Sequence, residues 1–218
     1  MYVGSERTVT EAFFCISGFL KRICTISVRH DILIVKSAEI KKGKGKQPMI
    51  KIDDWVIEKG EKAQGKIKVT GYGIAMPATV ICGVEDGPTI LITAGIHSAE
   101  YVGIQAAIEL AKEFQPEELK GNVIIVPLVN VSGFEHRTMS LVHEDGKNLN
   151  RVFPGDPEGT AADRIAYTIV TKLFSIADYY IDLHSGDGFE QLHPYVYYVG
   201  VVDEKTAEVT EKPEGATC

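Results

Sequence analysis

The chain has 218 residues, of which 44% are hydrophobic and 24% are charged, and its formal net charge at pH 7 is −7. This length suits one domain, or one domain with an appendage, and allows a sizeable core. From residue 49 onward acidic residues outnumber basic ones, which argues against a nucleic-acid-binding surface. The four cysteines, Cys15, Cys24, Cys82 and Cys218, show no CxxC spacing and predict reduced, unreactive thiols in the cytoplasm.

The first 48 residues differ in character from the rest of the chain. The apolar stretch AFFCISGFL (12–20) has acidic residues before it and basic residues after it, the wrong charge order for a signal peptide, and it is too short to span a bilayer. The run KKGKGKQP (41–48) is typical of a linker. We therefore expect a functionally silent N-terminal extension and basic linker over 1–48, a main domain over 49–218, and no membrane association.

The first half of the main domain combines strand patterns with one helix pattern. GKIKVTG (65–71) and ATVICGVE (78–85) predict strands, and EDGP (85–88) predicts a turn before the apolar strand TILITA (89–94). Residues 101–114 predict an amphipathic helix, and NVIIVPLV (122–129) predicts a strand buried on both faces. The apolar face of that helix would hold Ile104, Ala107, Ile108 and Ala111.

The second half begins with a polar, turn-rich stretch of the kind that binds or catalyses. A helix is expected after Thr160, where TAAD forms a capping box. Its apolar stripe would hold Ala162, Ile165, Ala166, Ile169, Leu173 and Ile176. DYYIDLH (178–184) and HPYVYYVG (193–200) predict two further strands. The alternation of strands and helices predicts an α/β fold with a largely parallel sheet.

Three side chains with metal-ligand chemistry follow predicted strands. His97 and Glu100 come just after TILITA, and His184 ends DYYIDLH. Ligand sites in open α/β sheets lie beyond the carboxyl ends of the strands, so these residues are candidates for one site. Two imidazoles and one carboxylate, with water in the fourth position, form a catalytic zinc set, although His-x-x-Glu alone is also a common chance pattern.

Other polar residues each have two interpretations. Asp182 is either a residue that orients an imidazole or a strand-end carboxylate in water. Asn150 and Arg151, in HEDGKNLNRVFPGDPEG (143–159), either bind a substrate carboxylate or belong to a surface loop. His136 and Arg137 are either oxyanion-stabilising or exposed cations. His30, His143 and His193 have no partner that the sequence identifies.

Three motifs in series, AGIHSAEYVG, DGKNLNRVFPG and DLHS, resemble the succinylglutamate desuccinylase and aspartoacylase family within the zinc carboxypeptidase-like clan. The resemblance covers roughly residues 65–200. It implies a three-layer αβα fold with a mixed, largely parallel central sheet. It also implies one Zn²⁺ per chain. The residue roles that the resemblance implies are zinc ligands His97, Glu100 and His184, a substrate-carboxylate pair Asn150 and Arg151, and a loosely matched catalytic Arg137.

The chain departs from the family pattern at three points. Ser98 stands where the family usually has glycine, and Met139 occupies a common position of the family's catalytic arginine. The family's general-base glutamate lies well downstream of the third ligand, so we expect it beyond residue 218 and expect the fold to be incomplete at the C-terminus. None of the late glutamates is assigned that role: Glu204, Glu208, Glu211 and Glu214.

The function that the resemblance implies is zinc-dependent hydrolysis of the amide bond of an N-acyl amino acid. Two alternatives are a metallocarboxypeptidase that acts on peptides and a catalytically inactive metal-binding fragment. The expected partner is a small N-acyl amino acid or a short peptide. The oligomeric state is left open.

Overall fold

The computed structural model describes residues 34–39, 49–190, 192 and 195–198. Its strands are β1 (Ile34–Glu39), β2 (Met49–Ile52), β3 (Trp55–Glu58), β4 (Lys62–Lys68), β5 (Ala75–Cys82), β6 (Glu85–Ala94), β7 (Lys120–Val126), β8 (Tyr179–His184) and β9 (Tyr195–Tyr198). Its helices are α2 (Tyr101–Glu113), α3 (Val131–His136) and α4 (Ala161–Thr168), with the short turns η1 (Pro116–Glu118), η2 (Leu149–Arg151) and η3 (Ile169–Phe174).

The main sheet has seven strands in the order β4-β5-β7-β6-β8-β1-β9. The central strand β6 is parallel to both of its neighbours, β7 and β8, whereas β4, β5 and β7 pair in antiparallel fashion. At the other edge β1 is antiparallel to β8 and parallel to β9. The sheet is therefore mixed, with its parallel strands at the centre, where β6 and β8 end side by side with Ala94 opposite Leu183.

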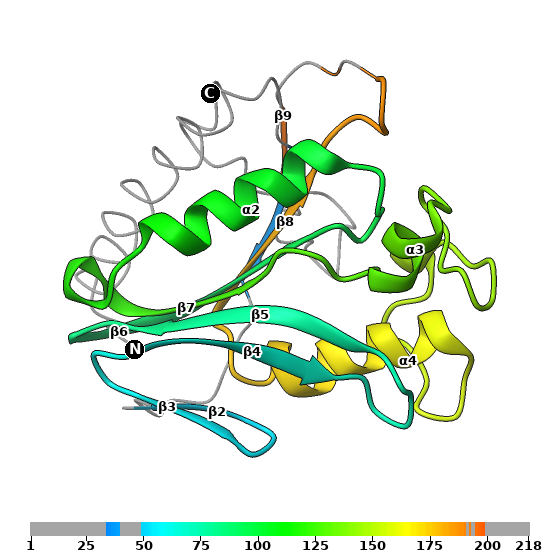
Figure 1. The fold of residues 1–218 in the computed structure, drawn as a ribbon. Coiled ribbons are helices and arrows are strands. Elements are labelled where there is room, and N and C mark those ends of the chain that lie inside the picture. Colours follow the sequence, from blue (N-terminus) through cyan, green and yellow to red (C-terminus); the bar gives the residue numbers. More distant parts are fainter. Residues whose placement is uncertain (1–33, 40–48, 191, 193–194, 199–218) are drawn as a thin grey trace, which may run out of the picture.

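Helices cover both faces of the sheet, as Figure 1 shows. One hydrophobic cluster joins α2 to the sheet through Ala107, Leu110 and Ile92. A second cluster on the opposite face joins α4 to β5 and to the β2–β3 hairpin, with Ile57 and Ile165 among its buried residues. The three-layer αβα fold with a mixed sheet is thereby confirmed.

Two details of the first half differ from the sequence interpretation. The helix expected at 101–114 forms as α2, but Ile108 on its expected apolar face is only half-buried. The turn expected at EDGP was wrong, because these residues begin β6 and pair irregularly between Glu85 and Thr89. A Cβ on Gly87 would lie 2.7 Å from the backbone nitrogen of Gly121, so this glycine serves a close backbone approach.

The helix after Thr160 begins as predicted, with a capping box between Thr160 and Asp163. It then widens into the π-helical turn η3 rather than continuing as one α-helix. The apolar stripe is buried at Ala162, Ile165, Ala166, Ile169 and Leu173 and partly buried at Ile176.

The predicted strand at 193–200 is present as β9, whereas AFFCISGFL, KKGKGKQP and residues 199–218 lie outside the described residues. Strand β1 falls inside the range 1–48 and pairs with β8, so this piece of the expected extension contributes to the main sheet. The division of the chain at residue 48 stays a prediction. In the described part of the chain no helix is both long enough and apolar enough to cross a membrane.

Candidate metal centre

Two neighbouring parallel strands bring the three candidate ligands together. His97 lies three residues after β6, Glu100 immediately precedes α2, and His184 is the last residue of β8. The turn after β6 needs Gly95, which has φ of 64° and whose Cβ would lie 2.9 Å from the side chain of Leu128. One ligand atom from each of His97, Glu100 and His184 lies within 4.8 Å of the other two.

The Glu100 carboxylate lies between the two imidazole rings. Its Oε1 accepts from His97 Nδ1 at 2.7 Å, and its Oε2 accepts from His184 Nδ1 at 2.8 Å. The backbone N–H of Ser185 also donates to Oε2, at 3.1 Å. The side chains are mostly buried, with exposed fractions of 16% for His97, 7% for Glu100 and 5% for His184. Both Nδ1 atoms therefore face the same carboxylate, and these side chains are largely shielded from water.

The second ring nitrogen of each histidine, Nε2, has its own hydrogen-bond partner outside the three candidate ligands. His184 Nε2 donates to Asp182 Oδ2 at 2.7 Å. His97 Nε2 lies 3.1 Å from Asn148 Oδ1, an atom that also accepts the backbone N–H of Asn150. Because metal-binding histidines usually have the second nitrogen hydrogen-bonded, this arrangement leaves Nδ1 of each ring for a metal. Two imidazoles and a carboxylate are a donor set that zinc takes, so the residues fit such an ion.

The charged groups shift one another's protonation. Burial by itself would raise the pKa of Glu100, but hydrogen bonds and charge from His184 and His97 lower that pKa to about 2. Burial by itself would lower the pKa of His184, but the charges of Asp182 and Glu100 and their hydrogen bonds raise it to about 9. In the metal-free protein at neutral pH the His184 ring therefore carries a proton on each nitrogen, one facing Glu100 and one facing Asp182. The proton on Nδ1 occupies the place where a cation would bind.

Asp182 is a buried partner of His184. Only 3% of the residue is exposed, and its Oδ1 accepts the hydroxyl of Thr93 at 2.7 Å. The sequence left open whether Asp182 orients an imidazole or lies in water. Its burial and its contacts support the first interpretation.

The loop that carries Asn150 and Arg151 reaches the site through Asn148. Asn148 caps the turn η2 by accepting from Asn150, and the same oxygen contacts His97. Arg151 is exposed, and its guanidinium donates to the Asn150 carbonyl at 3.2 Å. The structure thus links Asn150 to His97 through Asn148, while the described contacts of Arg151 are with Asn148 and Asn150 of its own turn. Sequence reasoning missed Asn148, although the spacing N-x-N was visible.

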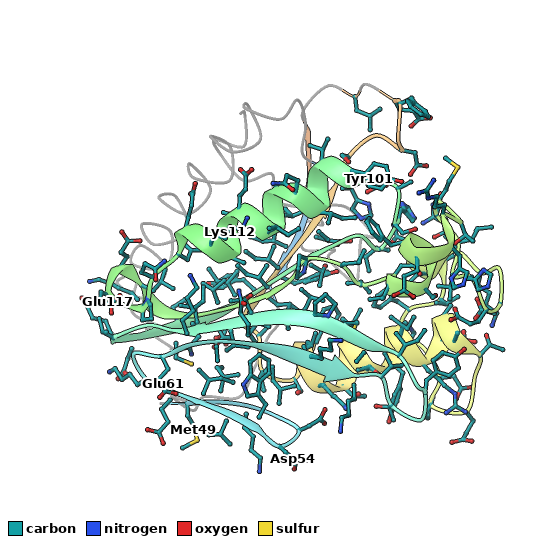
Figure 2. The ribbon with its side chains drawn as sticks, viewed as in Figure 1. Met49, Asp54, Glu61, Tyr101, Lys112 and Glu117 are labelled. Atoms are coloured by element: carbon teal, nitrogen blue, oxygen red, sulfur yellow. The ribbon has the colours of Figure 1, made fainter. Side chains whose placement is uncertain are left out.

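Arg137 lies beside the ligand loop at a small pocket. This pocket is lined by Ser98, Ala99, Tyr101, Gly133, Phe134, Arg137 and Met139. Both the N–H and the hydroxyl of Ser98 donate to the Met139 carbonyl, at 2.8 Å and 2.6 Å. The serine that departs from the family pattern therefore joins the loop 97–100 to the segment that carries Arg137. Figure 2 marks Tyr101, a further pocket residue, at the end of α2 where the site lies.

His143 has a partner that the sequence did not identify. Its ring stacks on His136 with a centroid distance of 3.7 Å and an interplanar angle of 5°. His136 Nδ1 in turn donates to the Ser132 carbonyl at 2.9 Å. The interpretation of His143 as a residue without a partner was therefore wrong. His30 and His193 lie outside the described residues.

Comparisons with known proteins show which family the chain resembles. Residues 86–207, more than half of the chain, match the succinylglutamate desuccinylase/aspartoacylase catalytic domain. The N-alpha-acetyl-L-2,4-diaminobutyric acid deacetylase of Halomonas elongata is 40% identical over 124 residues, which are 56% of this chain and 35% of that protein.

Two solved structures are similar at the level of both sequence and fold. The succinylglutamate desuccinylase/aspartoacylase from Rhodobacter sphaeroides is 30% identical with a TM-score of 0.54, covering 69% of this chain and 44% of that one. The product-bound ectoine utilization protein EutE (DoeB) from Ruegeria pomeroyi is 33% identical with a TM-score of 0.54, covering 65% and 44%. The chain thus spans less than half the length of these relatives.

Proposed function

Because the chain belongs to the succinylglutamate desuccinylase/aspartoacylase family, we propose that it is a zinc-dependent hydrolase that cleaves the amide bond of an N-acyl amino acid. One observation supports this proposal above the others. His97, Glu100 and His184 come from separate segments, yet their ligand atoms meet within 4.8 Å at the carboxyl ends of parallel strands. This is the place where an α/β sheet carries its active site.

The residues have distinct roles in the proposed reaction. His97, Glu100 and His184 hold one zinc ion, which when bound supplies a Lewis acid that polarises a carbonyl and acidifies water. Arg137, at the pocket beside the ligand loop, stabilises negative charge on the carbonyl oxygen of the scissile amide. Asn150 and Arg151 hold the substrate carboxylate by an amide donor and a bidentate guanidinium.

The substrate class follows from the relatives. We propose a small N-acyl amino acid, and the name of the Halomonas elongata protein makes an N-acetyl diamino acid the first compound to test. We place the general base outside the described residues, and we assign none of the described glutamates to that role. The cytoplasmic location also stays a prediction. The described Cys82 is a buried free thiol, which is compatible with a reducing compartment.

The first test is the zinc content of the purified chain and of His184→Ala, measured by elemental analysis under zinc-replete conditions. We expect close to one zinc per chain, and loss of it in the variant, because His184 supplies one of three ligands. A wild-type chain that binds no zinc would contradict the proposed function.

The second test compares substrates for the zinc-loaded chain. N-acetyl-diaminobutyrate, N-acetylaspartate and N-succinylglutamate are assayed beside peptides with free and with blocked C-termini. Hydrolysis of N-acyl amino acids alone supports a deacylase. Hydrolysis confined to peptides with free C-termini indicates a carboxypeptidase. A zinc-bound chain that hydrolyses neither class is compared with a longer version of the protein that includes the general base, and inactivity of both indicates a metal-binding protein.

The third test separates the roles of the two arginines by steady-state kinetics of a full-length version of the protein. Arg151→Ala is expected to raise KM at least tenfold with zinc content unchanged, since a charge-assisted bidentate contact contributes about 1.5–3 kcal/mol. Arg137→Ala is expected to lower kcat instead, because its charge acts on the transition state. An unchanged KM in Arg151→Ala would remove this residue from the substrate site.

A further inference from the structure

We propose that two unlike outer contacts, the Asp182 carboxylate behind His184 and the Asn148 amide behind His97, set how tightly the centre binds its metal. Thr93 and Tyr180 are the positioning residues that hold Asp182 in place. This inference rests on the proposed metal centre, and it assigns roles to residues that are not ligands.

The contacts behind His184 form one directed chain of hydrogen bonds. Asp182 and Thr93 lie opposite each other in the parallel pairing of β8 with β6. The Thr93 hydroxyl has a single hydrogen, and Asp182 Oδ1 accepts it at 2.7 Å. The Tyr180 hydroxyl, 2.9 Å from Thr93 Oγ1, must therefore be the donor in that pair. This series of hydrogen bonds runs from Tyr180 through Thr93 to Asp182, which also accepts from His184 Nε2.

The hydrogen bonds described for the Asp182 carboxylate come from Thr93 and His184. Thr93 is fully buried and Asp182 is 3% exposed. A buried carboxylate without partners would be costly, but here each of its oxygens accepts one hydrogen bond. Its negative charge acts through the imidazole and makes Nδ1 of His184 a stronger electron donor to a metal.

The contact behind His97 comes from a neutral group, and that group is held less firmly than Asp182. Asn148 is half-buried on a loop, and its single oxygen serves both His97 Nε2 at 3.1 Å and the Asn150 N–H at 2.9 Å. A neutral amide orients the ring but adds no negative charge to it. The two imidazoles are therefore unequal ligands, with His184 the stronger one.

The experiment exchanges these outer groups and measures zinc affinity by chelator competition, with the visible spectrum of the cobalt(II)-loaded protein as a second readout. Asp182→Asn is expected to weaken zinc binding 10- to 100-fold, the range typical of such outer partners. Thr93→Val is expected to weaken it severalfold, and Asn148→Asp, which keeps both acceptor contacts, to tighten it severalfold. Tyr180→Phe should weaken it less than Thr93→Val does. The cobalt spectrum should shift in Asp182→Asn, because the donor strength of the ligand changes.

Thr89→Val is the matched control. Thr89 lies on the same strand, is also buried, and accepts from Asn122 Nδ2 at 3.1 Å, away from the ligands. Its zinc affinity should equal that of the wild type. Circular dichroism of each metal-free variant identifies any that fails to fold. If Asp182→Asn or Thr93→Val does not fold, the zinc affinity of Asn148→Asp, a change at a half-buried position, tests the proposal instead.

Two failures are distinguishable. A wild-type chain that binds no zinc contradicts the proposed function itself. If the wild type binds zinc while Asp182→Asn and Asn148→Asp both bind it with wild-type affinity, the metal centre stands and the inference about its outer contacts is overturned.

Discussion

At the scale of single residues, Glu100 connects both candidate histidines. Each of its oxygens accepts from one imidazole, and a carboxylate held in this way stays ionised. Without metal, the proton on His184 replaces the cation and holds the same groups together. The protonation of this cluster and the stability of the metal-free protein are therefore linked.

The stability of the metal-free protein should accordingly depend on pH in both directions. The pKa of His184 is raised from 6.5 to about 9, so its contribution is complete below about pH 6.5 and is lost as the pH rises through 9. The pKa of Glu100 is lowered from 4.5 to about 2, so its contribution is present above about pH 4.5 and is lost as the pH falls through 2. Thermal unfolding in a chelator should show the midpoint falling between about pH 6.5 and about pH 9.

The control for this prediction is His184→Gln, which has no titrating group at that position. Its unfolding midpoint should fall less over the alkaline range than that of the wild type. Equal slopes for the two proteins would show that His184 does not carry the effect.

At the scale of elements, the close packing of α2 on β8 determines how near Glu100 lies to His184. Gly103 makes this contact possible, because a Cβ there would lie 3.0 Å from the Leu183 carbonyl oxygen. The contact is next to the site in sequence, since Glu100 precedes α2 and His184 ends β8. A larger residue at this position would push the helix away from the strand and separate the two groups.

Gly103→Ala is expected to destabilise the protein despite the better helix propensity of alanine. The propensity gain is up to about 1 kcal/mol, whereas overpacking costs about 1–3 kcal/mol, so the net loss is on the order of 1 kcal/mol. Zinc affinity should fall as well. Gly73→Ala is the matched control, because no heavy atom lies within 4 Å of a Cβ at that position. A Gly103→Ala protein as stable as the wild type would show that α2 has room to move.

The start of α4 is tied to the loop that carries Asn148. Asp145 Oδ2 accepts from the Thr160 hydroxyl at 2.6 Å and from the Ala162 N–H at 2.8 Å, while Asp163 accepts the Thr160 N–H at 3.0 Å. The capping box that the sequence predicted thus has an additional partner from the preceding loop. The cap therefore joins the helix to the candidate substrate loop.

Thr160→Ala should lower the free energy of unfolding by about 0.5–2 kcal/mol, the usual cost of losing an N-cap side chain. Urea unfolding followed by circular dichroism measures it. Thr160→Ser keeps the hydroxyl and should lie close to the wild type. If both variants lose the same stability, the methyl group rather than the hydrogen bonds is responsible.

At the scale of the whole molecule, the sheet carries the candidate ligands at one edge of its parallel centre. β6 and β8 pair directly, and the carboxyl ends of both strands lie near the start of α2 (Figure 1). A metal at that edge would cross-link the loop after β6 to the end of β8, segments 87 residues apart in the chain when counted from His97 to His184. Such a link adds stability to the whole domain, because the unfolded chain lacks the assembled site.

Removal of metal should therefore lower the unfolding temperature of the wild-type protein. Free zinc at 100 times its dissociation constant stabilises a protein by about 2.7 kcal/mol, which corresponds to roughly 5–10 °C for a domain of this size. Differential scanning calorimetry with zinc and with a chelator measures the shift. His184→Ala should show no shift, and an equal shift in the variant would mean that the metal binds elsewhere.

Much of the fold followed from the sequence, because its signals are local. The period of α2, the capping box at Thr160 and the apolar runs of β7 and β8 each lie within one segment. The predicted turn at EDGP was wrong because Gly87 is needed for the close approach of its backbone to Gly121 on the paired strand β7. This contact is not visible in the sequence. Local turn chemistry does not distinguish these two uses of glycine.

The residues of the candidate site also fall into those that the sequence identified and those that only the structure identified. His97, Glu100 and His184 were identified from the sequence, because a polar residue at the end of an apolar strand is a local pattern. For Asp182 the sequence offered two interpretations, and the tertiary structure supports the one in which it orients His184. The contacts of Thr93 with Asp182 and of Asn148 with His97 came from the tertiary structure alone, since they join segments far apart in the chain. Such contacts depend on strand order and register, which arise only when the sheet assembles.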